Sequence, residues 1–589
     1  MTRNDKPVAV SAWARPFSRR RMTALLCAGA CAAATALPAH ARPIGGGRAV
    51  PYPYVSQCPN APAPGAVGRY VSTTGSDSNN GLTLASAFRS VTKGLQMARP
   101  GDVVYVASGV YREQVDMYTG GGQPGKPVTL RNISAWPVIT GSDPVSPSGW
   151  TLLRGAIYAH PWPSNSQQVF VDGLPLAQMG NTGYVHHPDQ YTVQGSGLAD
   201  LDRRAGAFWY DKNASVLYVR LANNSSPAAH VVEASTRRRA LFLDRTRTPY
   251  VCIEAMIFRH SNQTADAEQG PGVALSNGSV LANSLVEYMD FMGVDVGGDG
   301  ARVAYSTVRR NGAVGLTSSG KKGVIIERNQ VVENNYRGFI VDWISGGMKF
   351  DSHFSGMVRD NAVARNTGPG IWFDGCQIGG PITVWANYVH DNRPGESAIL
   401  IEVSSNALVA NNLVVANAKR GIYLSASTHS RVLFNTILRS NARAGLEIGG
   451  TPRGALTVND NEARGNIIAF TFKASTDPNA VYDLDVSRDS AAFNNSSNDN
   501  LFFRRGASLL FSSTFEFTTL DAWRSGTGWD LQSQSADPLF TDEARNDFTL
   551  TAGSPARGKV NSIAAVPTDH DGVPRPPGGK SDQGAFQFQ

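Results

Sequence analysis

Three acidic side chains end three short segments of similar pattern. The segments are GMKFD, GIWFD and AILIE, which end at Asp351, Asp374 and Glu402. If they form neighbouring parallel strands about 4.8 Å apart, the three carboxylates stand in register on one face, where like charges destabilise a sheet. Such an array favours one protonated and one ionised carboxylate, as a general acid and a nucleophile require. The pattern therefore predicts carboxylate-based catalysis.

The residues beside these acids suggest a carbohydrate substrate. Asp374 and Glu402 would lie on adjacent strands, near the ~5 to 5.5 Å separation of retaining glycosidases, whereas carboxylates two strands apart approach the inverting range. Trp372 and Tyr423 fall on the same face and offer flat surfaces for sugar rings. His353, in the following loop, is a further candidate contact to substrate. The same carboxylates could instead bind calcium through their oxygens.

Lys349 lies beside the acids and admits two interpretations. It can form an ion pair with Asp351 and orient it, or it can abstract a proton as a catalytic base. A different register, with GFIVD as the strand, would put Asp342 in the place of Asp351. The interval from the first glycine of GMKFD to Val358 equals the interval from Gly421 to Val432, which favours the GMKFD strand.

A repeated pattern, apolar-x-x-Asn/Ser-x-apolar, positions these segments. Its polar residues recur every 22 to 32 residues, the length of one solenoid coil with loop insertions. They form the column Ser284, Ser306, Asn329, Asn361, Asn387, Asn412 and Asn435. Each coil adds a short alternating strand and helical periodicity is nearly absent, so the sequence predicts an all-β parallel β-helix with the asparagines stacked at a bend.

The remaining chain divides around these coils. Residues 66–140 are predicted to form an N-terminal cap and the first coils, with one helix that presents Ala87, Val91, Leu95 and Ala98 on one face. Residues 141–250 alternate without the coil period and predict an inserted β-rich subdomain. Residues 251–510 are predicted to form the right-handed parallel β-helix with the catalytic region. Residues 511–589 are expected to be an extension that packs on the solenoid.

The N-terminus has the pattern of an export signal, with a basic region, a short apolar run and an Ala-x-Ala cleavage pattern, so residues 1–41 are excluded from the fold. Its removal lowers the formal net charge from +7 to about +2, which does not suggest nucleic-acid binding. We expect a secreted or periplasmic monomer that is not held in a membrane. Cys58, Cys252 and Cys376 remain; they allow one disulfide at most, and buried or free thiols are the favoured interpretation.

The segments YVSTTGSDSNNG, GDVVYVASGVYRE and DPLF…DFTL…SPA resemble secreted right-handed β-helix enzymes of the pectate-lyase-like superfamily. The coils from GGMKFD to ILIEVSS are similar to those of β-helix glycoside hydrolases of the β-xylosidase kind. That resemblance implies Asp374 as nucleophile and Glu402 as acid/base, without a cofactor. The chain departs from the pattern at Gly375, where a second Trp is expected, and at Ser405-Asn406, where His-Gly is expected.

Two other functions stay open. In a polysaccharide lyase acting on a uronate-containing polymer, Lys349 would abstract the C5 proton and the acids would hold Ca²⁺. In a non-catalytic carbohydrate-binding β-helix, the aromatic residues would suffice and stacked carboxylates would not be needed. The hydrolase acting on a polysaccharide or oligosaccharide is the favoured prediction.

Overall fold

The structure is a computed structural model that describes residues 41–43, 49–51, 54–180, 197–262, 270–341, 343–377, 380–393, 395, 397–440, 443–453, 457–470, 482–486 and 494–589. These residues belong to one compact unit, Ala39–Gln589. The predicted signal peptide lies outside the described residues except for its last residue, and Asp342 lies outside them too. No helix within the described ranges is long and apolar enough to cross a membrane.

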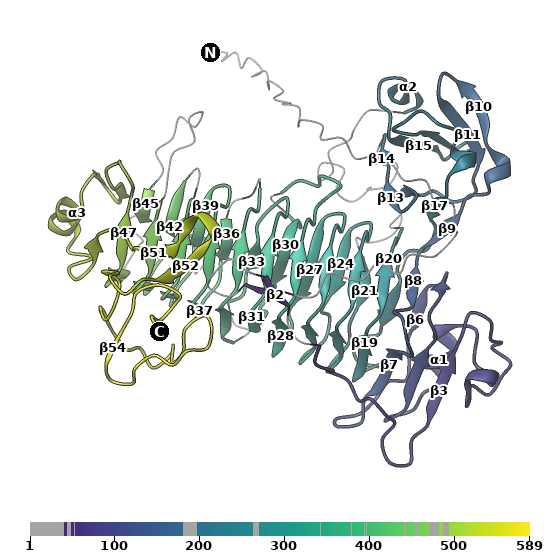
Figure 1. The fold of residues 1–589 in the computed structure, drawn as a ribbon, viewed down its shortest axis with the longest axis horizontal. Coiled ribbons are helices and arrows are strands. Elements are labelled where there is room, and N and C mark those ends of the chain that lie inside the picture. The colour runs from purple at the N-terminus through teal and green to yellow at the C-terminus, as the bar shows by residue number, and fades with distance from the viewer. Residues whose placement is uncertain are drawn as a thin grey trace. The chain divides into compact units, whose positions relative to one another are not determined.

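Short strands stack into three long sheets, so the chain forms a parallel β-helix, as predicted (Figure 1). Successive strands visit sheet 1, sheet 2 and sheet 3 in turn, and each pairs with the equivalent strand of the next coil. Sheet 1, which carries the predicted acids, contains β6 (Val115–Met117), β18 (Leu241–Leu243), β21 (Pro271–Ala274), β24 (Met292–Asp295), β27 (Val314–Ser319), β30 (Gly346–Asp351), β33 (Ile371–Asp374), β36 (Ser397–Glu402), β39 (Arg420–Ser425), β42 (Ala444–Gly449), β45 (Tyr482–Val486), β48 (Phe511–Ser512) and, antiparallel, β49 (Glu516–Phe517).

The other two sheets complete each coil. Sheet 2 contains β3 (Gly68–Val71), β4 (Val103–Val106), β7 (Val128–Asn132), β19 (Val251–Glu254), β22 (Val280–Ala282), β25 (Arg302–Ala304), β28 (Val324–Glu327), β31 (Gly356–Arg359), β34 (Ile382–Trp385), β37 (Ala407–Ala410), β40 (Arg431–Leu433), β43 (Glu462–Arg464) and β46 (Ser496–Asn498). Sheet 3 contains β5 (Val110–Tyr111), β8 (Val138–Thr140), β20 (Ile257–Arg259), β23 (Leu285–Glu287), β26 (Thr307–Arg309), β29 (Gln330–Val332), β32 (Ala362–Ala364), β35 (Tyr388–His390), β38 (Leu413–Val415), β41 (Thr436–Leu438), β44 (Ile467–Ala469), β47 (Leu501–Phe503) and β50 (Gln534–Ser535).

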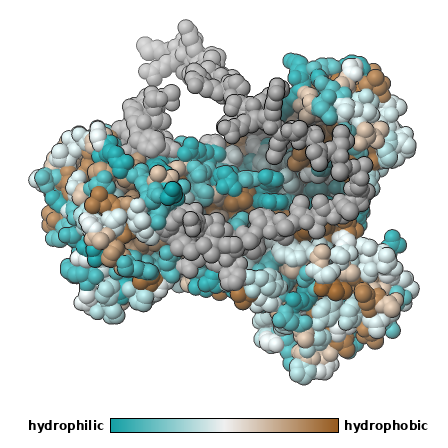
Figure 2. All heavy atoms as spheres, viewed as in Figure 1, coloured by the Kyte–Doolittle hydropathy of each residue, from teal (hydrophilic) through white to brown (hydrophobic). Residues whose placement is uncertain are grey.

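Alternation along each strand separates core from surface. In β33, Ile371 and Phe373 are fully buried in the core that runs through the coils, which leaves Asp374 on the outer face of sheet 1. Figure 2 shows mainly hydrophilic residues over the outer face near β36 and β42. Inward apolar residues therefore stabilise the solenoid, and the outer face of sheet 1 is available for polar chemistry.

The predicted asparagine column forms a hydrogen-bonded ladder at the bend between sheets 2 and 3. The side chain of Asn361 accepts from the backbone N–H and the Nδ2 of Asn329, at 3.0 Å each, and donates to the Oδ1 of Asn387 at 3.0 Å. The same pattern continues beyond the predicted column to Asn466 and Asn500. A second ladder, which was not predicted, follows sheet 3 through Asn311, Asn334, Asn366, Asn392 and Asn417. Stacked amides thus satisfy the buried polar groups of both bends.

The N-terminal part caps the open end of the solenoid. Helix α1 (Val91–Met97) is capped by Ser90, whose side chain accepts from the backbone N–H of Lys93, and it buries Val91 and Leu95. The helix is shorter than predicted: Ala87 and Ala98, which were expected on its apolar face, are buried but lie outside it. A short helical turn, η1 (Leu84–Ser86), precedes α1, and β1 (Ala41–Pro43) pairs with β2 (Ala49–Pro51).

An antiparallel subdomain is inserted after β8, as predicted. One sheet contains β10 (Thr151–Arg154), β11 (Ile157–Pro161), β16 (Val216–Arg220), β15 (Ala207–Asp211) and, parallel to β15, β14 (Ala177–Gln178). The other contains β13 (Leu174–Pro175), β12 (Val169–Val171), β17 (Val232–Ser235) and β9 (Ser142–Pro144). Short helical segments join them at η2 (Pro147–Gly149), α2 (Leu198–Leu201) and η4 (Pro227–Ala229). The last antiparallel strand of the subdomain ends at Ser235, and the next strand, β18, belongs to sheet 1. The predicted range 141–250 therefore includes the start of the next coil.

The C-terminal residues finish the solenoid and then pack against it. Helix α3 (Leu520–Thr527) buries Trp523 against the last coils. The segments that follow contain β51 (Phe540–Asp542), η5 (Glu543–Arg545), β52 (Asp547–Leu550), β53 (Val560–Asn561) and β54 (Lys580–Ser581). His570 Nδ1 lies 2.9 Å from the Asn411 carbonyl, and the Ala585 N–H donates to Thr436 Oγ1 at 2.9 Å. The extension thus contacts the coils directly.

A disulfide corrects the expectation of free thiols for two of the three cysteines. Cys58 and Cys252 are bonded, whereas Cys376 is a buried free thiol. The bond ties the N-terminal segment to β19, where Ser56 Oγ also donates to Glu254 Oε2 at 2.7 Å. Their separation of 194 residues concealed the pair in the sequence. Disulfides persist in oxidising compartments, so the bond indicates an extracytoplasmic location.

Candidate active site

The predicted register of the acids on sheet 1 is confirmed. Asp351 pairs with Asp374, and Asp374 pairs with Glu402, on the neighbouring strands β30, β33 and β36. Ser319 and Ser425 occupy the same column on either side. The adjacent column also agrees with the prediction and reads Thr317, Lys349, Trp372, Leu400 and Tyr423. The structure therefore brings the three carboxylates together in neighbouring coils.

Lys349 is fixed between an acid and an aromatic ring. Its Nζ atom lies 3.0 Å from Asp374 Oδ2 and 3.5 Å from the centre of the Trp372 ring, and it donates to the Trp343 carbonyl at 2.8 Å. Its partner is Asp374 on the next strand, rather than the Asp351 of its own strand that the sequence suggested. The reason is that the side chain crosses the strand direction over the Trp372 face, where a cation–π contact adds to the ion pair.

Glu402 has a partner at each oxygen. Trp372 Nε1 donates to Glu402 Oε2 at 2.9 Å, and Arg453 Nη1 lies 2.7 Å from Oε1. The Glu402 side chain is 12% exposed, whereas that of Arg453 is 55% exposed and reaches the acid from the loop after β42. Sequence reasoning missed Arg453, because the loop position carries no periodic signal and its contact crosses 51 residues of chain.

Two of the predicted substrate contacts differ from the expected geometry. Trp372 is only 5% exposed, so its ring is not the open sugar platform that the alternation suggested; Lys349 covers one face and Glu402 accepts from its edge. Tyr423 is half-buried beneath Arg420, whose guanidinium carbon lies 4.3 Å from the ring centre. Burial, with the nearby charge of Glu447, raises the pKa of the Tyr423 hydroxyl. Both aromatic residues are thus parts of the polar network around the acids.

The loop residues near Asp374 leave space above it. His353 is exposed and in a left-handed conformation, with φ of +68°, and its backbone N–H donates to the Gly375 carbonyl at 3.1 Å. Gly375, where the resembled family has Trp, has φ of +69° and open space where a Cβ would stand. Ser405 Oγ donates to the Gln377 carbonyl at 2.7 Å. A side chain at position 375 would be strained there, so the surface beside Asp374 is left open.

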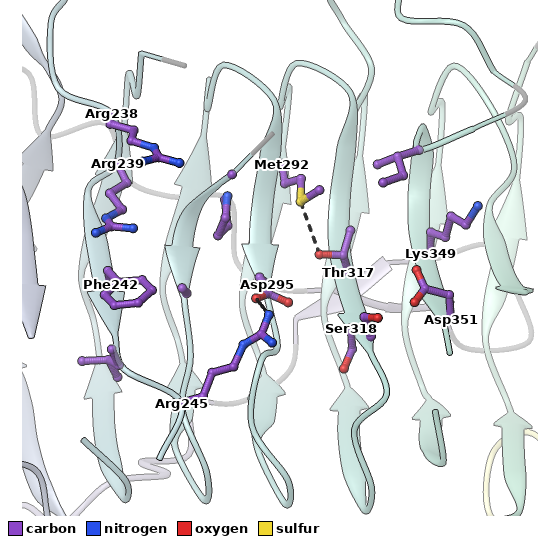
Figure 3. A pocket seen from close by; sticks show the side chains of 16 residues that line it. Arg238, Arg239, Phe242, Arg245, Met292, Asp295, Thr317, Ser318, Lys349 and Asp351 are labelled. Carbon is purple, nitrogen blue, oxygen red and sulfur yellow. Dashed lines mark hydrogen bonds and ion pairs between the residues drawn. The ribbon is translucent and has the colours of Figure 1, made fainter. Parts of the chain in front are cut away.

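A cavity of about 390 Å³ extends along sheet 1 from Lys349 and Asp351 toward the N-terminal coils (Figure 3). Its charged lining includes Asp295, which was not predicted and lies 3.4 Å from Arg245, and two further arginines at its far end, Arg238 and Arg239. Burial raises the pKa of Asp295, and the nearby Arg245 opposes that shift. The cavity therefore places both basic and acidic side chains on the same face as the predicted acids.

The described acids of sheet 1 are not arranged as a metal site. Within the described ranges, no group of three or more His, Cys, Asp or Glu side chains is placed to hold a metal ion. Two of the three stacked acids instead have basic partners, because Lys349 pairs with Asp374 and Arg453 pairs with Glu402. These partners offset the repulsion that three carboxylates in register would otherwise produce.

Comparisons with known proteins agree with this architecture. The family model for the right-handed beta helix region matches residues 271–437 and 344–483. The YwoF protein of Bacillus subtilis (strain 168) is 23% identical over 509 residues, covering 83% of this chain and 92% of that protein. A structure described as XylC in complex with xylose superposes with a TM-score of 0.64 at 14% identity, covering 89% of this chain and 98% of that one. A structure described as a glycoside hydrolase has a TM-score of 0.48 at 13% identity, covering 83% and 99%. The match to the family model and the superposition on XylC show that the chain has the right-handed parallel β-helix fold.

Proposed function

We propose that the protein is an exported, carbohydrate-active enzyme, a retaining glycoside hydrolase that cleaves a polysaccharide or oligosaccharide. The observation that carries the proposal is the direct pairing of Asp374 with Glu402 on adjacent strands of an open, polar sheet face. Adjacent parallel strands are about 4.8 Å apart, close to the ~5 to 5.5 Å carboxylate separation of retaining enzymes. The similarity in fold to XylC, whose structure is described as a xylose complex, supports a sugar substrate.

In the first step, Asp374 attacks the anomeric carbon. Lys349 holds Oδ2, so Oδ1 forms the new bond, while the bond from the anomeric carbon to the leaving oxygen breaks and Glu402 gives that oxygen its proton. In the second step, Glu402 takes a proton from water, the water oxygen bonds to the anomeric carbon, and the Asp374 ester breaks. Two inversions release a sugar with retained configuration.

The contacts of Glu402 assign separate tasks to its two neighbours. Trp372 Nε1 fixes Oε2 and hence the direction of the carboxyl group. The acid role requires a proton on Glu402, and therefore release of Oε1 from Arg453, whose largely exposed side chain can move into solvent. Arg453 is thus a positioning residue that can pair with Glu402 while this side chain is ionised, in the glycosyl-enzyme stage between the two steps.

The environment of Lys349 supports the hydrolase over the lyase. A lysine that abstracts the C5 proton of a uronate needs an amine aimed at the substrate. Here its Nζ atom is engaged by Asp374, by the Trp343 carbonyl and by the Trp372 ring. This arrangement suits a residue that orients the nucleophile.

The test is incubation of the mature protein with a panel of polysaccharides and aryl glycosides. New reducing ends, with the first product in the anomeric configuration of the substrate by NMR, are the expected result. Ultraviolet absorbance from unsaturated products would overturn the proposal in favour of the lyase. Binding of oligosaccharide without any product would favour the non-catalytic β-helix.

A further inference from the structure

The loop between β29 and β30 is an insertion beside the acids, and it carries an exposed tryptophan. The bend residues Asn329 and Asn361 are 32 residues apart across this coil, whereas the equivalent spacing is 23 residues in the coil before and 26 in the coil after. Trp343, in this loop, is 48% exposed. It is the only exposed tryptophan in the part of the chain that the structure describes. Loops on a regular scaffold commonly carry binding residues.

The loop is held against sheet 1 on both sides of Trp343. Phe339 is buried and its ring lies 4.9 Å from that of Phe291, and Ile344 packs against the same cluster. The Trp343 carbonyl accepts from Lys349 Nζ at 2.8 Å. Because its neighbours in the loop are anchored, the exposed indole has a defined place, as a binding surface requires.

Lys349 also relates the indole to the proposed nucleophile. Its Nζ atom lies 5.6 Å from the centre of the Trp343 ring and 3.0 Å from Asp374 Oδ2. The two distances share this atom, so the ring centre lies no more than 8.6 Å from Oδ2. The next residue, Ile344, lines the cavity on sheet 1 together with Lys349 and Asp351. The indole therefore lies close to both the acid column and the cavity.

Trp343 has the accessible surface that Trp372 lacks. Trp372 is buried and Lys349 lies over one face of its ring, so a sugar has no access to that face. The face of an aromatic ring is weakly negative and attracts the weakly positive C–H groups of a sugar, and the contact also removes apolar surface of both partners from water. Trp343 keeps about half of its surface for such a contact.

We propose that Trp343 is the platform on which a sugar unit of the substrate stacks at the cleavage site. It is a specificity-determining residue, because it selects a sugar ring that presents an apolar C–H face at this position. The inference rests on the proposed function, since it concerns the same substrate. The stacking contact is made in the ground state and in the transition state alike, so its main effect is on affinity.

The first test measures binding by calorimetry in the Glu402→Gln protein, which turns over natural oligosaccharides slowly. The probes are neutral oligosaccharides of xylose, glucose, mannose, galactose and arabinose, and oligogalacturonates. In this background, Trp343→Ala should weaken binding of the tightest probe about 10-fold, and Trp343→Phe, which keeps a smaller aromatic face, should recover part of the loss. Phe515→Ala is the matched control, because Phe515 is 70% exposed but lies between β48 and β49, four strand steps from β36.

Two further measurements separate stacking from a structural role. The tightest probe should protect the tryptophan fluorescence of the Glu402→Gln protein from acrylamide quenching, and Trp343→Phe should remove most of that protection. With Glu402 intact, Trp343→Ala should raise KM about 10-fold with a smaller effect on kcat. The carbonyl that holds Lys349 is a backbone group and is kept in both variants, so a fall in kcat at unchanged KM would overturn the inference.

The outcomes for the platform and for the hydrolase are distinguishable. Equal affinity with and without Trp343→Ala, equal effects of Trp343→Ala and Phe515→Ala, or no binding of any probe would overturn the inference. Binding that depends on Trp343 without any product would contradict the hydrolase and keep the platform. Product formation that is unaffected by Trp343→Ala would contradict the platform and keep the hydrolase.

Discussion

The Nζ atom of Lys349 lies 3.0 Å from Asp374 Oδ2 and also 3.5 Å over the centre of the Trp372 ring. Lys349 therefore offsets the charge of Asp374, the proposed nucleophile, and also contacts the Trp372 indole that donates to Glu402. The two halves of the proposed acid–nucleophile pair are coupled through this lysine and tryptophan, although they share no direct bond.

This coupling predicts the behaviour of Lys349 variants. Lys349→Met should lower kcat by about 10- to 100-fold with little effect on KM, because it removes a fixed charge next to the reacting carboxylate. Lys349→Arg keeps the positive charge and should recover part of the lost kcat. Lys349→Met should also shift the pH dependence of kcat, which the loss of a purely structural contact would not do. A Lys349→Ala protein that binds substrate without turnover, with unsaturated products from the wild type, would identify the residue as a lyase base.

Asp374→Asn is expected to abolish formation of the glycosyl-enzyme. An amide cannot act as the nucleophile, so the rate should fall by ~10³-fold or more, and no aryl leaving group should restore it. Rapid-mixing measurement of the released phenol checks this. Asp351→Asn is the matched neighbour on β30 and should retain more activity, because it is outside the catalytic pair.

Glu402→Gln should behave differently from Asp374→Asn. It removes the proton donor, at a cost of about 10²- to 10⁴-fold on natural leaving groups, but keeps the nucleophile. Activated aryl glycosides should still react in the first step and then stall, and azide should accelerate release with retained configuration. An inverted azide product would mean that water attacks directly, and would make Asp351, two strands from Glu402, the partner. Wild-type rates in both variants would mean that the acids are only a charged surface.

Activity is expected to be independent of added metal. Asp374 and Glu402 have Lys349 and Arg453 as partners and are assigned to covalent and proton chemistry. Dialysis against EDTA should therefore leave kcat/KM unchanged. Loss of activity that calcium restores would support the lyase mechanism.

The cysteines allow a test of the fold that needs no substrate. Burial raises the pKa of the Cys376 thiol to about 12, so at pH 8 almost none is thiolate, and a thiol reagent should not label the native protein. Denaturation without reductant should expose one thiol per mature chain, because Cys58 and Cys252 stay bonded. Cys58→Ser should lower the free energy of unfolding by about 5 kcal/mol in the loop-entropy model. Three reactive thiols in the denatured, unreduced protein would contradict the bond.

Local repetition explains why the fold and the acid column could be predicted from sequence. A coil repeats its bend residue and its alternation at a nearly fixed interval, so the position of Asn361 or Asn387 fixes which residues face outward in the next strand. The carboxylates of Asp351 and Asp374 follow directly from that register.

What the repeat could not predict depends on contacts between distant segments. Arg453 reaches Glu402 from a loop, and Arg245 reaches Asp295 across two strands of sheet 1, and neither contact has a period. The exposure of Trp372 was also misjudged, since alternation decides which way a side chain points but not whether a neighbour such as Lys349 covers it.

The asparagine ladder has a direction. The side-chain amide N–H of each asparagine donates to the amide oxygen of the asparagine in the following coil, so the amide dipoles align. Their sum leaves a partial positive charge at the C-terminal end of the ladder, whereas the positive end of an α-helix is its N-terminus. At that end, Asn500 Nδ2 donates at 3.1 Å to the buried carboxylate of Asp530, which also accepts from Trp523 Nε1 of α3. The acidic group of the capping segment therefore faces the positive end of the ladder. A capping segment that offered a hydrogen-bond donor there would leave the Asn500 amide N–H facing another donor.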